Sequence, residues 1–126
     1  MKSLNPKGVA WVGLYAMDLG QLVSFYEHKL GLRLIERAEK FCIFDAGANT
    51  HFEIWPNGLS VPSCKSPHEQ SMIVGFLVER LEPVIAELQT RGLNPDTDIN
   101  SYLGTRWIYY TDPEGNRFEL KDNNGE

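Results

Sequence analysis

Two glutamates and one histidine are the residues of this chain best suited to chemistry. Glu53 lies in the segment HFEIW (51–55), and Glu119 lies in the segment RFEL (117–120). A carboxylate can act as a general base when burial raises its pKa, and carboxylates combine with imidazole in metal sites. Glu53 and Glu119 are therefore candidate catalytic residues, and His51, Glu53 and Glu119 are a candidate metal site.

Polar and apolar residues alternate in both segments. Because successive side chains of a strand point to opposite faces, we expect the apolar residues to face the helices. The polar residues His51, Glu53, Arg117 and Glu119 then share the opposite face. A sheet with one wet face would give the same alternation, so the pattern alone leaves open whether the glutamates line a cleft.

The elements that position these residues follow one order in both halves of the chain. In the first half, a strand over 9–17 precedes a helix that starts after Asp18, a typical N-cap, and ends at Gly31. In the second half, a strand over 72–79 precedes a helix that ends at Gly92. Further strands are predicted over 32–37, 40–46 and 50–55 and, after a loose segment around 94–104, in a hairpin of 107–111 and 117–120.

The whole chain, 1–126, is predicted to form a single domain of two modules. Module one spans 8–56, a proline-rich linker spans 57–71, and module two spans 72–122. Each module has one amphipathic helix and a sheet too small to bury its apolar face alone. We therefore expect the two modules to share a core.

Composition excludes several classes of protein. The formal charge is 12 − 17 = −5 with no cluster of Lys or Arg, which argues against nucleic-acid binding. No apolar run approaches the ~18 residues of a membrane helix, and no signal-peptide pattern is present, so we expect no membrane association. Cys42 and Cys64 lack metal-binding spacing and are interpreted as reduced thiols of a cytoplasmic protein, with a disulfide as the alternative.

Several motifs resemble the vicinal-oxygen-chelate superfamily. They are LYAMDL (14–19), FY (25–26), LGL (30–32) and YYTDPEGNRFEL (109–120), and the resemblance covers about 8–122. This superfamily includes glyoxalase I, extradiol dioxygenases, fosfomycin-resistance transferases and bleomycin-resistance proteins. The resemblance implies an α+β fold in which paired βαβββ modules form curved mixed sheets around a cleft, often completed by dimerisation.

The resemblance also locates the positions of the family's metal ligands. Two of the four positions hold Trp11 and Ile73, which cannot coordinate a divalent ion, whereas Glu53 and Glu119 are kept. We therefore expect no metal and no other cofactor. The alternative is the displaced site formed by His51, Glu53 and Glu119.

Aromatic residues give a second indication of a binding site. A tyrosine three residues before the Asp-Pro turn, here Tyr109, resembles a substrate-contacting position of fosfomycin-resistance enzymes. Rings beside carboxylates suit a flat or cationic organic ligand, although the same rings would also fill a closed core. The predicted ligand-binding residues are Trp11, Tyr15, His51, Glu53, Trp55, Ile73, Trp107, Tyr109 and Glu119.

These observations favour a metal-free protein that binds a small organic molecule, sequestering a cationic or aromatic compound, as a homodimer. One alternative is a lyase, isomerase or dioxygenase-like enzyme that uses Glu53 or Glu119 as a base, or the displaced metal site. A second alternative is a structural or partner-binding protein with a filled cleft. Arg106 and Arg117 are expected either to contact an anionic group of the ligand or to neutralise the two glutamates.

Overall fold

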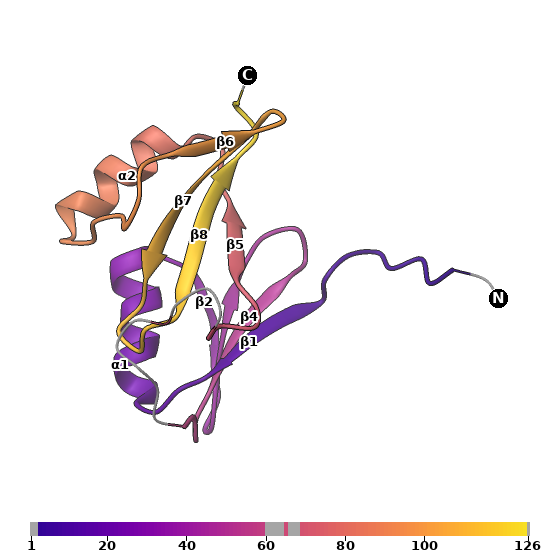
Figure 1. Cartoon of the computed structure of the whole chain (residues 1–126). Coiled ribbons are helices and arrows are strands. Elements are labelled where there is room, and N and C mark those ends of the chain that lie inside the picture. The colour runs from indigo at the N-terminus through magenta and orange to yellow at the C-terminus, as the bar shows by residue number, and fades with distance from the viewer. Residues whose placement is uncertain (1–2, 60–64, 66–68, 126) are drawn as a thin grey trace.

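A computed structural model describes residues 3–59, 65 and 69–125, and Cys64 lies outside the described residues. The chain forms two four-stranded sheets, each with a helix (Figure 1). The elements are β1 (Trp11–Tyr15), α1 (Leu19–Ser24), the π-helix η1 (Phe25–Leu30), β2 (Leu34–Arg37), β3 (Cys42–Asp45), β4 (His51–Trp55), β5 (Val74–Leu77), α2 (Leu81–Thr90), β6 (Asn100–Tyr102), β7 (Thr105–Thr111) and β8 (Arg117–Asp122).

The two sheets have the same topology. The strand order is β1-β4-β3-β2 in the first sheet and β5-β8-β7-β6 in the second sheet. β1 pairs in parallel with β4, and β5 pairs in parallel with β8. The other strand pairs are antiparallel. The predicted α+β class and the two βαβββ modules are confirmed, and β1 and β5 are edge strands.

The ends of the first helix follow from its sequence. The Asp18 side chain accepts a hydrogen bond from the backbone N–H of Gln21, which caps the first turn. Gly31, with φ of 89°, ends η1 in the left-handed conformation that glycine adopts without strain. The predicted helix is therefore present, and its second half has the wider π-helical turn.

The segment around 94–104 is more regular than predicted. Asn100–Tyr102 forms the edge strand β6, which is joined to β7 by a turn at Leu103 and Gly104. Both turn residues have positive φ, 49° for Leu103 and 82° for Gly104. The expectation of a loose segment was wrong here, and β6 completes the second βαβββ module.

The core lies between the helices and the apolar faces of both sheets. Rings of Phe25 and Tyr26 from η1 contact the ring of Phe118 on β8. Phe52 on β4 contacts Phe76 on β5, with the ring centroids 5.5 Å apart. Because residues of both halves contribute to this aromatic cluster, the two halves share one core, as predicted.

A turn of the second half also fastens the first helix. The buried Asp112 carboxylate accepts hydrogen bonds from the Tyr26 hydroxyl, at 2.8 Å, and from the backbone N–H groups of Glu114 and Asn116. The Glu114 carboxylate in turn accepts hydrogen bonds from the N–H groups of Met17 and Asp18. Burial, followed by the charge of Asp112, holds the pKa of Tyr26 well above its ordinary value, so the tyrosine remains a donor.

No helix among the described residues is long and apolar enough to cross a lipid bilayer.

Candidate functional site

The alternation predicted for β4 and β8 is present in the structure. Phe52 and Ile54 are buried beneath the helices, as are Phe118 and Leu120, whereas Glu53 and Glu119 are partly exposed on the opposite side. We call this opposite side of each sheet its open face. The first sheet and the second sheet therefore each present one of the two glutamates on an open face.

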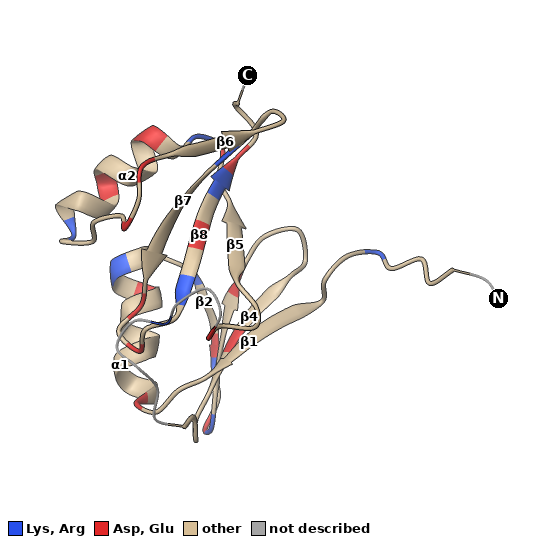
Figure 2. Ribbon diagram, viewed as in Figure 1, with Lys and Arg blue, Asp and Glu red and all other residues tan. Residues whose placement is uncertain are grey.

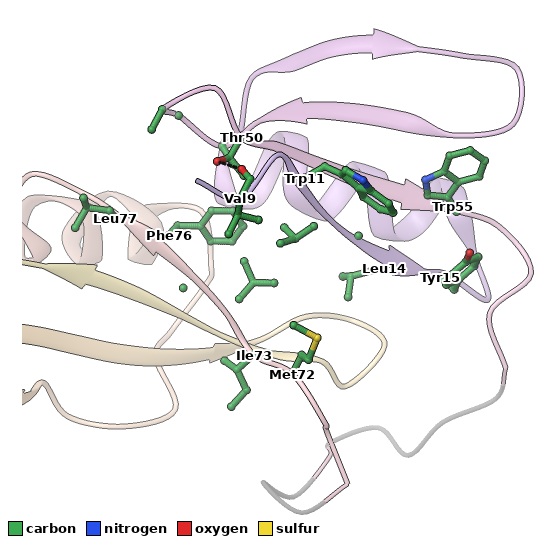
Figure 3. A pocket seen from close by; sticks show the side chains of 17 residues that line it. Val9, Trp11, Leu14, Tyr15, Thr50, Trp55, Met72, Ile73, Phe76 and Leu77 are labelled. Atoms are coloured by element: carbon green, nitrogen blue, oxygen red, sulfur yellow. Dashed lines mark hydrogen bonds between the residues drawn. The ribbon is translucent and has the colours of Figure 1, made fainter. Parts of the chain in front are cut away.

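A cavity of about 760 Å³ lies between the edge strands β1 and β5 (Figure 3). We call it the β1–β5 cavity. Four predicted ligand-binding residues line it, namely Trp11, Tyr15, Trp55 and Ile73. The volume is in the range of small-molecule sites, and none of the described residues that line it has a charged side chain. The other lining residues are Val9, Val12, Gly13, Leu14, Ala46, Gly47, Ala48, Thr50, Met72, Val74, Gly75, Phe76 and Leu77.

Trp11 has its position because Gly13 has no side chain. A methyl group added at Gly13 would lie 2.7 Å from Cζ3 of Trp11, so the indole lies across the space that a side chain would occupy. Trp11 is 55% exposed and Tyr15 is 72% exposed, and both project from β1 (Figure 3). Two large rings are therefore accessible at one wall of the cavity.

Glu53 is linked to the cavity through a tryptophan. The Nε1–H group of Trp55 donates a hydrogen bond to the Glu53 carboxylate at 3.0 Å. The Trp55 ring stacks on Phe41, with an interplanar angle of 5° and 4.1 Å between centroids. Glu53 does not itself line the cavity, but it fixes the orientation of a ring that does.

His51, Trp107, Tyr109 and Glu119 also lie outside the cavity lining. His51 is exposed at the start of β4, directly opposite Trp11 in the register of β1 and β4. Trp107 and Tyr109 are on β7, and Tyr109 lies opposite Glu119 on β8. Four of the nine predicted ligand-binding residues therefore line the cavity within one chain. Trp107, Tyr109 and Glu119 lie outside it on the second sheet.

Arg106 does not neutralise Glu53 or Glu119, which was one of the two roles expected from the sequence. Its guanidinium donates hydrogen bonds to the buried Asp122 carboxylate and to Glu82, at 2.7 Å and 2.6 Å respectively. These contacts hold the pKa of Glu82 at about 2 and the pKa of Asp122 well below its ordinary value. Asp122 also accepts a hydrogen bond from the backbone N–H group of Leu81, so this network caps the start of α2. Arg106 forms these contacts and none with Glu53 or Glu119 among the described residues.

A metal ion does not fit the residues that the structure describes. Trp11 and Ile73 stand at two of the expected metal-ligand positions, and neither side chain has an atom that can coordinate a divalent ion. Across residues 3–59, 65 and 69–125, no three side chains of His, Cys, Asp or Glu are grouped so that they could hold an ion. The alternative site of His51, Glu53 and Glu119 is therefore not assembled within one chain.

Sequence reasoning missed part of the cavity wall. The turn between β3 and β4 contributes Ala46, Gly47, Ala48 and Thr50, and positive φ values are found at Gly47, Ala48 and Asn49. Left-handed residues other than glycine are uncommon and often mark functional segments. The signal in the sequence is the run of small residues AGAN (46–49), which lies between the predicted strands 40–46 and 50–55.

Comparisons with known proteins agree with this architecture. The sequence profile described as Glyoxalase/Bleomycin resistance protein/Dioxygenase superfamily matches residues 8–120. The chain belongs to this superfamily. A comparison with curated proteins found no match.

Solved structures of this superfamily have the same fold. A glyoxalase/dioxygenase from Nostoc punctiforme is 16% identical with a TM-score of 0.73, and 98% of this chain and 97% of that chain are covered. A glyoxalase/bleomycin resistance protein/dioxygenase from Nocardioides is 22% identical with a TM-score of 0.69, covering 95% and 85%. A glyoxalase family protein from Bacillus anthracis is 21% identical with a TM-score of 0.76, covering 97% and 99%. At these identities the likeness concerns the fold alone.

Proposed function

We propose that this member of the glyoxalase/bleomycin-resistance superfamily binds a small organic molecule with a flat, apolar body and uses no metal. The observation that carries the proposal is the β1–β5 cavity, which is large enough for such a molecule and lined by Trp11, Tyr15 and Trp55. Aromatic rings supply large contact areas at low cost in side-chain entropy. The accessible rings of β1 therefore make an aromatic compound the best-matched ligand class.

A positive charge on the ligand is also favoured. Glu53 accepts a hydrogen bond from Trp55, and neither Glu53 nor Glu119 forms an ion pair with a described residue. Carboxylates without a cationic partner attract a cation, and aromatic faces add to that attraction. The proposed ligand is therefore an aromatic compound that carries an amine or another cationic group, and binding sequesters it.

Calorimetric titration with 4-methylbenzylamine tests this proposal. The amine is flat and cationic, and 4-methylbenzoate provides an anionic probe of the same shape. Tyr15→Ala should weaken binding of the amine about tenfold or more, because it removes a ring from the cavity wall. Tyr102→Ala is the matched control, since Tyr102 is similarly exposed, at 67%, but lies on β6 outside the cavity.

The expected order of affinity is 4-methylbenzylamine above 4-methylbenzoate, with Tyr102→Ala behaving as the wild type. Equal loss in both tyrosine variants, or no heat from either probe, would contradict the proposal. Tighter binding of 4-methylbenzoate than of the amine would contradict the proposed preference for a cationic ligand, but it would leave the cavity as the binding site.

We also propose that the protein is a homodimer. β1 and β5 are edge strands, and both carry large exposed apolar side chains, including Tyr15 and Leu77. Because each chain has both edges, a second copy can cover each of them in a two-fold arrangement. Leu77→Lys should shift the protein toward monomer in sedimentation velocity, whereas Leu103→Lys, at an exposed turn, should not.

A further inference from the structure

The open face of the second sheet has an alternating row of charges on β8. Arg117, Glu119 and Lys121 occur at every second position of this strand and therefore share one face (Figure 2). Tyr109 and Trp107 of β7 lie beside them, with Tyr109 opposite Glu119 and Trp107 opposite Lys121. The row therefore places a carboxylate between two cations, against two aromatic rings.

Arg117 is held in place and lacks an acceptor. Its guanidinium carbon lies 5.1 Å from the centroid of the Tyr109 ring. Its backbone N–H and C=O groups both pair with the side-chain amide of Gln70, at 2.8 Å and 2.6 Å. The Nε atom is buried, and no described residue accepts a hydrogen bond from it or forms an ion pair with this guanidinium. Buried donors without partners are rare, so this one requires an explanation.

Glu119 lies next to Arg117 on the same face but does not neutralise it. A methyl group added at Gly75 would lie 2.7 Å from Oε1 of Glu119, so the carboxylate lies over Gly75 on β5. Gly75 belongs to the lining of the β1–β5 cavity. A molecule bound in the cavity can therefore reach Glu119 across the bare backbone of Gly75, with Arg117 two residues further along β8.

We propose that the ligand is an aromatic compound with both a cationic and an anionic group. Glu119 contacts the cationic group, Arg117 binds the anionic group with its planar donors, and the Tyr109 ring lies between them. Residues two apart on a strand are about 6.6 Å apart, so the two charges of the ligand stand at a similar separation. This inference rests on the proposed function, because the ring of the ligand lies at the edge of the β1–β5 cavity next to Gly75, beside Glu119 on the neighbouring strand β8.

The probe for this inference is 4-(aminomethyl)benzoate, which carries an amine and a carboxylate at opposite ends of one ring. The wild type should bind it about tenfold more tightly than either 4-methylbenzylamine or 4-methylbenzoate. Arg117→Met should reduce its affinity to that of the amine. Arg80→Met is the matched control, because it removes the same charge from an exposed position.

Glu119→Gln gives the complementary test. It should reduce the affinity for 4-(aminomethyl)benzoate to that for 4-methylbenzoate, whereas Glu39→Gln, at an exposed position, should change nothing. Arg117→Lys keeps the positive charge without the planar donors. It should reduce, but not abolish, the gain in affinity for 4-(aminomethyl)benzoate over 4-methylbenzylamine. This variant also serves as the test if Arg117→Met fails to fold.

The outcomes separate this inference from the proposed function. If the wild type binds the amine through Tyr15 but gains nothing from the added carboxylate, the proposed function stands and the inference is overturned. A gain in affinity that is undiminished in Arg117→Met, or undiminished in Arg117→Lys, also overturns it. If neither the amine nor the zwitterion binds, both proposals fail.

Discussion

The contact between Tyr26 and Asp112 leads to a quantitative prediction for the variant Tyr26→Phe. This substitution removes one hydroxyl group and keeps the ring in the aromatic core. The Asp112 carboxylate accepts hydrogen bonds from the Tyr26 hydroxyl, from the N–H of Glu114, and from both the N–H and the side-chain amide of Asn116. In the variant, Oδ2 of Asp112 keeps only the side-chain amide of Asn116, at 2.9 Å.

The expected cost follows from burial and charge. Tyr26 is 1% exposed and Asp112 is 4% exposed, so bulk water does not replace the lost donor. A hydrogen bond to a charged group contributes about 1.5–3 kcal/mol to stability. Tyr26→Phe should therefore lower the free energy of unfolding by about 1.5–3 kcal/mol.

The chain provides a matched control for this substitution. Tyr110 is also fully buried, but its hydroxyl has no hydrogen-bond partner among the described residues. Removing an unpaired buried hydroxyl relieves a desolvation cost, so Tyr110→Phe should leave stability unchanged or raise it by up to about 1 kcal/mol. Urea unfolding followed by circular dichroism measures both variants. A loss below about 0.5 kcal/mol in Tyr26→Phe, or equal losses in both variants, would refute the reasoning.

Three further predictions concern other parts of the fold. Because Arg106 lowers the pKa of Asp122, the charge of Asp122 stabilises the protein above about pH 4, and this stabilisation is lost as the pH falls toward the lowered pKa. Asp122→Asn should therefore flatten the acid limb of stability against pH, as measured by urea unfolding at successive pH values. Leu103→Asn should raise stability by about 0.5–1 kcal/mol in the same assay, because Asn tolerates positive φ in a hairpin turn. Gly13→Ala should displace the Trp11 indole and change its fluorescence spectrum, because the added methyl group would lie 2.7 Å from Cζ3 of Trp11, which is free to move at the surface.

Most of the fold could be predicted because its elements have strong local signals. The N-cap at Asp18, the stop at Gly31 and the alternation around Glu53 and Glu119 all act within a few residues. The strand β6 was missed because it is short and exposed, and because its turn has Leu103 where Asn would mark a hairpin. The predicted boundaries of the two modules and the linker remain predictions.

The site could be predicted only in part, because it depends on how the two sheets pack. Alternation placed His51, Glu53 and Glu119 on the open faces correctly, but it gave no information on which residues meet across the sheets. The neutralisation of the two glutamates by Arg106 was predicted wrongly, although a signal was present. Arg106 lies two and four residues before the apolar Ile108 and Tyr110, so it is on the same face of β7 as they are, the helix-covered face that also carries Asp122.

The hydrogen bonds between Glu114 and the start of α1 have a consequence for protein synthesis. The N–H groups of Met17 and Asp18 obtain these partners only after residue 114 has left the ribosome. Until then the emerging first half has an incompletely capped helix, and the rings of Phe25, Tyr26 and Phe52 lack the second-half residues that cover them. An exposed apolar face of this kind is a target for chaperones and for aggregation during translation. The first half should therefore be protected from protease only after residue 114 has left the ribosome.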